Sequence, residues 1–236
     1  MTEYSIEPIG DETKTQEKLE RLFAFMTKRV ETTPAELRDQ YEAATAKFVV
    51  DAKAFVRRYS RNYIVRVLGP TPDFDSITEF AHVEGGPEQI RKSLRPGPMD
   101  FPPIARASYL KFSQRLVFGS APGCEPGPVW KRGILLRRAA EVSAATVTKE
   151  LAEFVDDMAK GLRGSIDRMM LYTPISARRN YPTIYYPTET ELDRSIDALV
   201  MMWPKKEGTL PETFDVPSSY RVLTVLDFES YDSKID

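Results

Sequence analysis

The chain of 236 residues runs twice through the same order of patterns, and this repetition strongly limits the folds open to it. An apolar segment with a basic end at residues 22–29 is matched by residues 133–138. A helical apolar stripe beginning at Glu36 is matched by one beginning at Glu150. The spacing between matched positions drifts along the chain, as loop insertions allow. We therefore predict two related units in one chain.

The first unit carries clear local signals. Thr33 can cap a helix, Pro34 suits its first position, and Glu36 completes a capping box. Apolar residues then recur at gaps of three and four, which predicts a helix packed on one face. We expect strands at 22–29, 62–67 and 74–83, a short helix at 88–94, and the end of a fourth strand at 116–119. This order, βαββαβ, is that of a ferredoxin-like unit.

The second unit repeats much of this order. Strands are predicted at 133–138, 166–172, 196–203 and 220–228, with a helix after Glu150. Asp75 and Asp197 occupy matched positions at the start of the third strand of each unit, and their recurrence predicts a turn or cap rather than chemistry.

Burial predicts how the two units combine. A four-stranded sheet with helices on one face leaves its other face uncovered, and buried apolar area stabilises by about 25 cal/mol per Å². We therefore expect an α+β fold in which units 17–120 and 129–230 pair into one intramolecular barrel with a shared cavity, joined by the linker 119–127. Fusing the units removes the need for a dimer to close the barrel but does not forbid a homodimer.

Composition excludes several classes of function. The formal net charge of −2 supplies no basic excess for a phosphate backbone, so no nucleic-acid partner is expected. The lone Cys124 permits neither an internal disulfide nor a cysteine-rich zinc site, and the lone His82 rules out paired-histidine metal sites. No apolar run has the length of a membrane span, so we expect no membrane partner and a cytoplasmic location.

The first unit resembles the EthD domain family, which belongs to the dimeric α+β barrel superfamily. The resemblance covers about residues 20–95 and rests on Arg29, the TPAEL motif at 33–37 with Tyr41, the segment RYSRNY at 58–63, and FDSITEF at 74–80. It implies a barrel with ligands inside, and relatives that include cofactor-free dehydratases, decarboxylases, cyclases, isomerases and monooxygenases, besides haem proteins.

One departure from the family pattern concerns a histidine that often follows the tyrosine matched by Tyr41. Residues 43–45 read Ala-Ala-Thr, and the second unit has Asp-Met-Ala at 157–159. No role of that histidine can be transferred to this chain.

Two residues of the predicted third strand are candidate catalytic groups. His82 is the only imidazole and suits proton transfer near neutral pH; the alternative is a strand-end histidine facing water. Glu79 lies in an apolar stretch, so it should face a polar cavity or form an ion pair with an arginine on the adjacent strand. The two residues have opposite parity, so a regular strand points them to opposite faces.

Four further residues are candidate substrate-binding groups. Arg29 and Arg138 end the first strand of each unit, where a guanidinium could hold a substrate carboxylate; the alternative is a solvated strand end. Tyr63 and Tyr172, on the second strands, could line the cavity with an aromatic wall that carries a hydroxyl group.

These features predict a cofactor-independent lyase, a dehydratase or decarboxylase, acting on a small and acidic aromatic or polyketide-like substrate. Such eliminations need a proton-transfer group and an anchored substrate. No metal or other cofactor is expected, and only His82 could serve as the usual axial ligand of a haem. An isomerase or cyclase with the same groups, or a non-catalytic small-molecule binder, are the alternatives.

Overall fold

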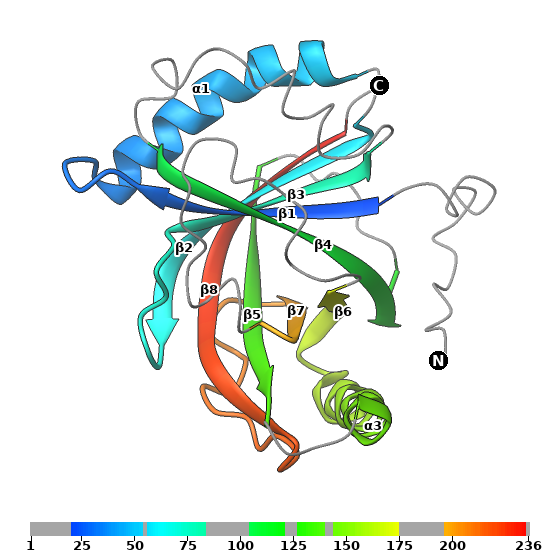
Figure 1. Ribbon diagram of the computed structural model, residues 1–236. Coiled ribbons are helices and arrows are strands. Elements are labelled where there is room, and N and C mark those ends of the chain that lie inside the picture. Colours follow the sequence, from blue (N-terminus) through cyan, green and yellow to red (C-terminus); the bar gives the residue numbers. More distant parts are fainter. Residues whose placement is uncertain are drawn as a thin grey trace.

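A computed structural model describes residues 20–53, 56–83, 104–120, 127–139, 144–174 and 196–234, and these residues form a closed antiparallel β-barrel (Figure 1). The described elements, in chain order, are β1 (Glu20–Lys28), α1 (Pro34–Ala52), β2 (Arg58–Leu68), β3 (Ser76–Val83), β4 (Ile104–Phe118), β5 (Pro128–Arg138), α3 (Ala144–Leu162), β6 (Ile166–Pro174), β7 (Ala198–Pro204) and β8 (Tyr220–Lys234).

The strand order around the barrel is β1-β3-β2-β8-β5-β7-β6-β4, with β4 returning to β1. Within each half the order is fourth, first, third, second, which is the order of a ferredoxin-like sheet. The halves join where β2 pairs with β8 and where β4 pairs with β6. The α+β barrel closed within one chain is thus confirmed, while descent of the halves from one duplicated unit stays a prediction.

The halves differ from two complete βαββαβ units in one described place. The connection between β7 and β8, residues 205–219, contains no helix. Gly208 has φ of +74° and prolines stand at 211 and 217, and such residues interrupt helical hydrogen bonding. The corresponding helix predicted at 88–94 in the first half lies outside the described residues.

Local signals in the sequence explain several element boundaries. The Thr33 backbone N–H donates to Glu36 Oε2 at 2.8 Å and the Glu36 N–H donates to Thr33 Oγ1 at 3.2 Å, so the predicted capping box is confirmed. Asp75 accepts the N–H of Lys28 at 2.8 Å, and Asp197 accepts that of Arg138 at the same distance. The two aspartates therefore tie the third strand to the end of the first strand in both halves, which confirms the predicted structural role.

Three apolar clusters form the core. One packs between α1 and the outer face of β1, β2 and β3, and includes Leu37, Tyr41 and Phe48 of the helix. A second packs between α3 and the outer face of the other half, and Figure 1 shows the two helices on opposite sides of the barrel. The third lies inside the barrel and includes Phe23 and Phe228. Each strand is therefore covered by apolar contacts on both faces, as an enclosed sheet requires.

The turn at Gly119 generates a test of the fold. Gly119 has φ of +88°, and a Cβ there would lie 2.1 Å from Asp167 O, so Gly119→Ala should lower the free energy of unfolding by about 3 kcal/mol or more. Gly127 has a similar φ of +91° with no atom within 4 Å, so Gly127→Ala should cost only ~1–2 kcal/mol. Chemical denaturation of both variants measures the difference, and equal losses would contradict the close approach at Gly119.

Candidate functional site

The barrel interior is divided into an apolar half and a polar half. Apolar side chains, among them Phe25, Ile77 and Leu135, occupy the end where β1 and β5 finish. At the other end, strand alternation directs polar side chains inward from seven of the strands. These interior polar residues are Arg21, Arg58, Ser60, Asn62, Glu79, Gln114, Lys131, Arg168, Tyr172, Ser230 and Asp232. The polar half is the candidate site.

The candidate site contains two polar clusters, and the first is a buried ion pair with a tyrosine beside it. Arg21 Nη1, on β1, lies 3.0 Å from Glu79 Oε1 on the adjacent strand β3, and their side chains are 5% and 12% exposed. Tyr172 reaches across from β6, and its hydroxyl donates to Glu79 Oε2 at 3.5 Å. Burial and the negative charge of Glu79 raise the pKa of Tyr172 well above its usual value, so the hydroxyl stays protonated.

A second buried ion pair lies beside the first. Lys131 Nζ, on β5, donates to Asp232 Oδ1 at 3.0 Å, Ser60 Oγ at 2.9 Å and Asn62 Oδ1 at 3.1 Å. These three bonds use all the donors of an ammonium group. Ser60 also donates to Asp232, and Ser230 donates to Asn62 Oδ1 at 2.8 Å. The cluster is therefore internally satisfied.

The environment of Asp232 keeps it charged. Burial alone would raise the pKa of Asp232, but the Lys131 ammonium and the hydrogen bonds from Ser60 and Lys131 outweigh burial, and the pKa lies below its usual value. The cluster is also contiguous with the first, because Ser60 on β2 is the register partner of Glu79 on β3. The Trp203 ring makes cation–π contacts with both cations, with Lys131 Nζ 5.2 Å and Arg168 Cζ 4.9 Å from the ring centroid.

Three buried polar atoms of the candidate site have no hydrogen-bond partner among the residues that the structure describes. They are Arg21 Nη2, Arg58 Nη1 and Gln114 Oε1. A buried unsatisfied donor costs about 1–3 kcal/mol, so such atoms in a folded protein call for an explanation. Two of them are guanidinium donors, and guanidinium groups suit an anion such as a carboxylate.

The structure brings two of the predicted site residues together. Glu79 and Tyr172 both face the interior and contact each other. Glu79 also forms the ion pair with an arginine on the neighbouring strand, Arg21, which the sequence had offered as the alternative to a cavity position. The backbone of His82 belongs to β3, but its side chain lies outside the described residues. The catalytic roles of Glu79 and His82 stay predictions.

Tyr63 does not line the interior. Its ring packs in the cluster between α1 and the barrel, and its hydroxyl donates to Glu42 Oε1 at 2.7 Å. The reason is strand alternation, because Ser60 and Asn62 face inward and their neighbours Tyr59, Arg61 and Tyr63 face the helix. The expected placement of Tyr63 at the cavity wall was therefore wrong.

Arg29 and Arg138 lie at the opposite end of the barrel from Glu79. They follow Arg21 and Lys131 along β1 and β5 by eight and seven residues, which corresponds to roughly 25 Å of extended chain. Arg29 lies 4.0 Å from Glu31, and Arg138 is exposed. The placement of these arginines beside Glu79 is therefore excluded, and the guanidinium group paired with Glu79 is that of Arg21.

Sequence reasoning missed Arg21, Lys131 and Asp232. Lys131 lies between the predicted linker 119–127 and the predicted strand 133–138, whereas β5 already begins at Pro128, five residues before that strand. A usable signal was present in β8, where Ser230 and Asp232 alternate with outward residues at the period of a strand. It becomes recognisable only once β8 is known to extend to Lys234.

Comparisons with known proteins identify the fold. No family model matches this sequence and no curated protein sequence matches it. An anthrone oxidase-like protein has a similar structure, with a TM-score of 0.51 and 10% identity over 92% of this chain and 93% of that one. A chlorite dismutase from Candidatus Nitrospira defluvii has a TM-score of 0.47 and 10% identity, over 90% and 91%. A putative monooxygenase from Lactobacillus acidophilus NCFM has a TM-score of 0.47 and 10% identity, over 93% and 100%.

The similarity to the anthrone oxidase-like structure shows a shared fold and nothing more at this identity. Membership of the EthD family therefore stays a prediction. Among the described residues no helix is long and apolar enough to cross a membrane, and no group of three or more metal-ligating side chains is gathered.

The Lys131 cluster generates a test of the site. Lys131→Met leaves Asp232 buried without its cation, so the free energy of unfolding should fall by about 3–5 kcal/mol. Adding Asp232→Asn removes the stranded charge and should recover part of that loss. A double-variant cycle by urea denaturation measures the coupling, and additive effects of the two changes would contradict a strong pair.

The Lys131–Asp232 pair also makes the stability of the protein depend on pH. Because the pKa of Asp232 is lower in the folded protein than in the unfolded chain, its contribution to stability is present above roughly pH 5 and is lost as the pH falls through the folded value. This acid-sensitive component should be absent from the Lys131→Met/Asp232→Asn variant.

Proposed function

We propose that this protein binds a small aromatic carboxylic acid in the polar half of its barrel and acts on it as a cofactor-independent lyase. The observation that carries the proposal is the set of unpartnered guanidinium donors of Arg21 and Arg58 in the same interior as Glu79 and Tyr172. These groups supply an anchor for an anion, a proton acceptor and a protonated hydroxyl in the same half of the barrel interior.

The substrate carboxylate pairs with the free donors of Arg21 and Arg58. Arg21 Nη1 is already held by Glu79, which leaves Nη2 directed at the ligand. The aromatic part of the substrate packs against Phe23, whose ring lies edge-to-face with both Phe112 and Tyr172 at centroid distances of 4.9 Å. Such a wall favours a planar, apolar body beside the anchored acid group.

Glu79 and Tyr172 supply the proposed chemistry. Glu79, as a carboxylate, accepts a proton from the substrate carbon, and the electron pair of that C–H bond expels a leaving group. Once Glu79 has taken up the proton, the Tyr172 hydroxyl, which keeps its own proton, turns from Glu79 and donates its one hydrogen bond to the oxygen on which negative charge develops. In a dehydration the proton taken up by Glu79 passes to the departing hydroxyl group, which leaves as water and returns Glu79 to the carboxylate. In a decarboxylation no C–H proton is removed: the C–C bond to the carboxylate breaks, carbon dioxide leaves, and the carbon that keeps the electron pair takes a proton from water.

Three alternatives use the same site. An isomerase or cyclase would need the same proton transfer without loss of a fragment, and a non-catalytic binder would need only the anchor and the aromatic wall. One structural neighbour is described as anthrone oxidase-like, so oxidation of an aromatic substrate is a further candidate reaction. Product analysis together with oxygen uptake distinguishes these alternatives.

The described part of the interior contains no histidine or cysteine side chain that could hold a haem iron. Such an iron takes an axial histidine, thiolate, methionine or tyrosine. The interior methionines Met170 and Met201 are packed among apolar side chains, and the hydroxyl of Tyr172 is engaged by Glu79. The steps proposed here use only side chains of the chain itself.

The anchor generates a binding test. 4-Hydroxybenzoate should bind at least roughly tenfold more tightly than phenol, because only the acid gives the buried guanidinium donors a charged partner. Arg58→Met should abolish this preference, while Arg115→Met, which removes an arginine paired with Asp156 beside α3, should preserve it. Calorimetric titration measures both ligands, and equal affinities in the wild-type protein would contradict the anion site.

The proton-transfer role generates a kinetic test. On a substrate found by screening aromatic acids, Glu79→Gln should lower kcat roughly 10²–10⁴-fold, because glutamine keeps the shape but cannot accept the proton. The matched control is Glu42→Gln, which breaks the Glu42–Arg61 pair on the outside of the barrel. It should lower stability and leave kcat unchanged. A Glu79→Gln protein that is destabilised but turns over at the wild-type rate would reduce Glu79 to an ion-pair partner.

A further inference from the structure

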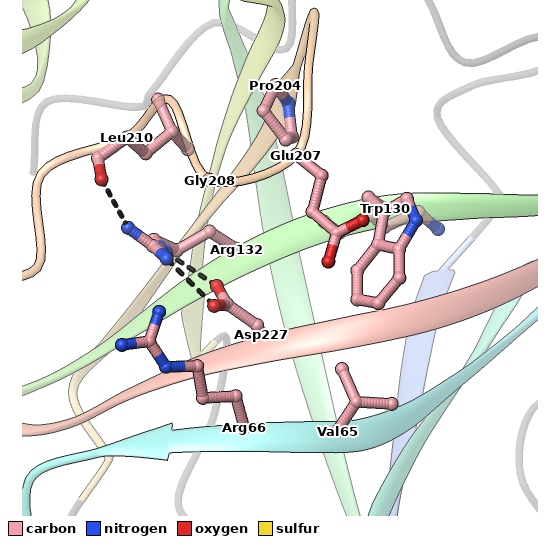
Figure 2. A pocket seen from close by; sticks show the side chains of 10 residues that line it. Val65, Arg66, Trp130, Arg132, Pro204, Glu207, Gly208, Leu210 and Asp227 are labelled. Atoms are coloured by element: carbon pink, nitrogen blue, oxygen red, sulfur yellow. Dashed lines mark hydrogen bonds and ion pairs between the residues drawn. The ribbon is translucent and has the colours of Figure 1, made fainter.

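A pocket lies on the outside of the barrel. It has a volume of about 240 Å³ and lies between β2, β5, β8 and the connection that follows β7. Figure 2 shows Val65 and Arg66 on β2 at one side, and Glu207 and Leu210 of the connection at the other. Nothing in the proposed function uses this pocket.

Two ion pairs hold the walls of this pocket in place. Arg132 forms a two-point ion pair with Asp227, at 2.6 and 2.8 Å, and also donates to Leu210 O at 2.8 Å and Pro211 O at 2.7 Å. Arg66 pairs with Glu212 at 2.5 Å. The connection is thereby fastened to β5 and to β2, so the pocket is a built feature of the fold.

The charges around the pocket leave one carboxylate uncompensated. Arg132 is neutralised by Asp227, Arg66 by Glu212, and Lys131 by Asp232 in the interior. Glu207 also lines the pocket, and no described residue forms an ion pair with it. Each cation of the lining thus has a carboxylate partner, and Glu207 presents an unpaired carboxylate at one wall, which favours a cationic group beside it.

The remaining lining is apolar and aromatic. Trp130 is 36% exposed and Val65 is 46% exposed, both unusually open for large apolar residues of strands. Pro204 and Leu210 add further apolar surface. In Figure 2 the Glu207 side chain extends from the connection toward the indole ring of Trp130. An aromatic face near a carboxylate is the arrangement that binds organic ammonium ions in proteins.

We propose that this exterior pocket is a binding site for a small organic ammonium compound with an apolar body. The ammonium group lies against the Trp130 ring and faces the Glu207 carboxylate. The apolar body fills the space beside Val65, Pro204 and Leu210. Lys131 also contributes to the wall of this pocket, but its ammonium group is held in the interior by Asp232, Ser60 and Asn62, so the charged groups of the two sites are separate.

The experiment compares phenethylammonium with 2-phenylethanol, a neutral molecule of nearly the same shape. Calorimetric titration of the full chain should show saturable binding of the cation, with the alcohol weaker by roughly fivefold or more. Trp130→Leu and Glu207→Gln should each weaken binding of the cation by roughly fivefold or more, whereas Glu150→Gln on α3, a carboxylate outside this pocket, should not change it.

The outcome separates this site from the interior one. Binding of 4-hydroxybenzoate should be the same in the Trp130 and Glu207 variants as in the wild-type protein, and phenethylammonium should bind equally well to Arg58→Met. Equal affinity for the amine and the alcohol, unchanged binding in both pocket variants, or no saturable binding of the amine would each overturn the proposal.

Discussion

The buried ammonium group of Lys131 constrains the whole barrel. An unpaired charge inside a protein is strongly unfavourable, so Lys131 needs partners on every side. They come from two strands: Asp232 on β8, and Ser60 and Asn62 on β2. The β2–β8 contact is one of the two places where the halves join, and there Ser60 is paired with Asp232. A slip of one residue would turn these partners to the outer face, so the cluster selects a single register for the join.

Stability of such a cluster is a separate matter from its specificity. Buried ion pairs often contribute little net free energy compared with apolar residues of similar size, because removing two charges from water is costly. The free energy that closes the barrel comes mainly from the three apolar clusters, which cover both faces of the strands. We infer that the polar half of the interior is retained for register and for ligand binding.

Strand β5 carries a cation on each face, and β8 supplies a carboxylate to each. Lys131 points inward to Asp232, while its neighbour Arg132 points outward to Asp227. The inner pair organises the candidate site, and the outer pair fastens the 205–219 connection over the exterior pocket. The two proposed sites are thus built on opposite faces of the same two strands, and this explains how they can be independent while depending on one register.

Sequence reasoning succeeded where the decisive interaction is local. The capping box of Thr33 and Glu36 involves residues three apart, and apolar patterns placed the two described helices and at least part of each described strand in the correct order. Asp75 was recognised as structural because its pattern recurs at Asp197. Glu79 was known to need a partner, but the sequence could not choose between an ion pair and a cavity, and the structure places it in contact with both Arg21 and Tyr172.

The failures have one physical cause. Alternation along a strand says that Tyr63 and Asn62 face opposite sides, but not which side is the interior. That is decided by α1, which covers the face carrying Tyr63. Arg29 and Arg138 were placed near the site because both end first strands, yet only the strand directions around the closed barrel show that the polar residues gather at the opposite end.

The sequence by itself determined the elements, their order and their two-faced character. Tertiary structure alone decided which face turned inward and which side chains met there, because those depend on pairing between strands far apart in the chain.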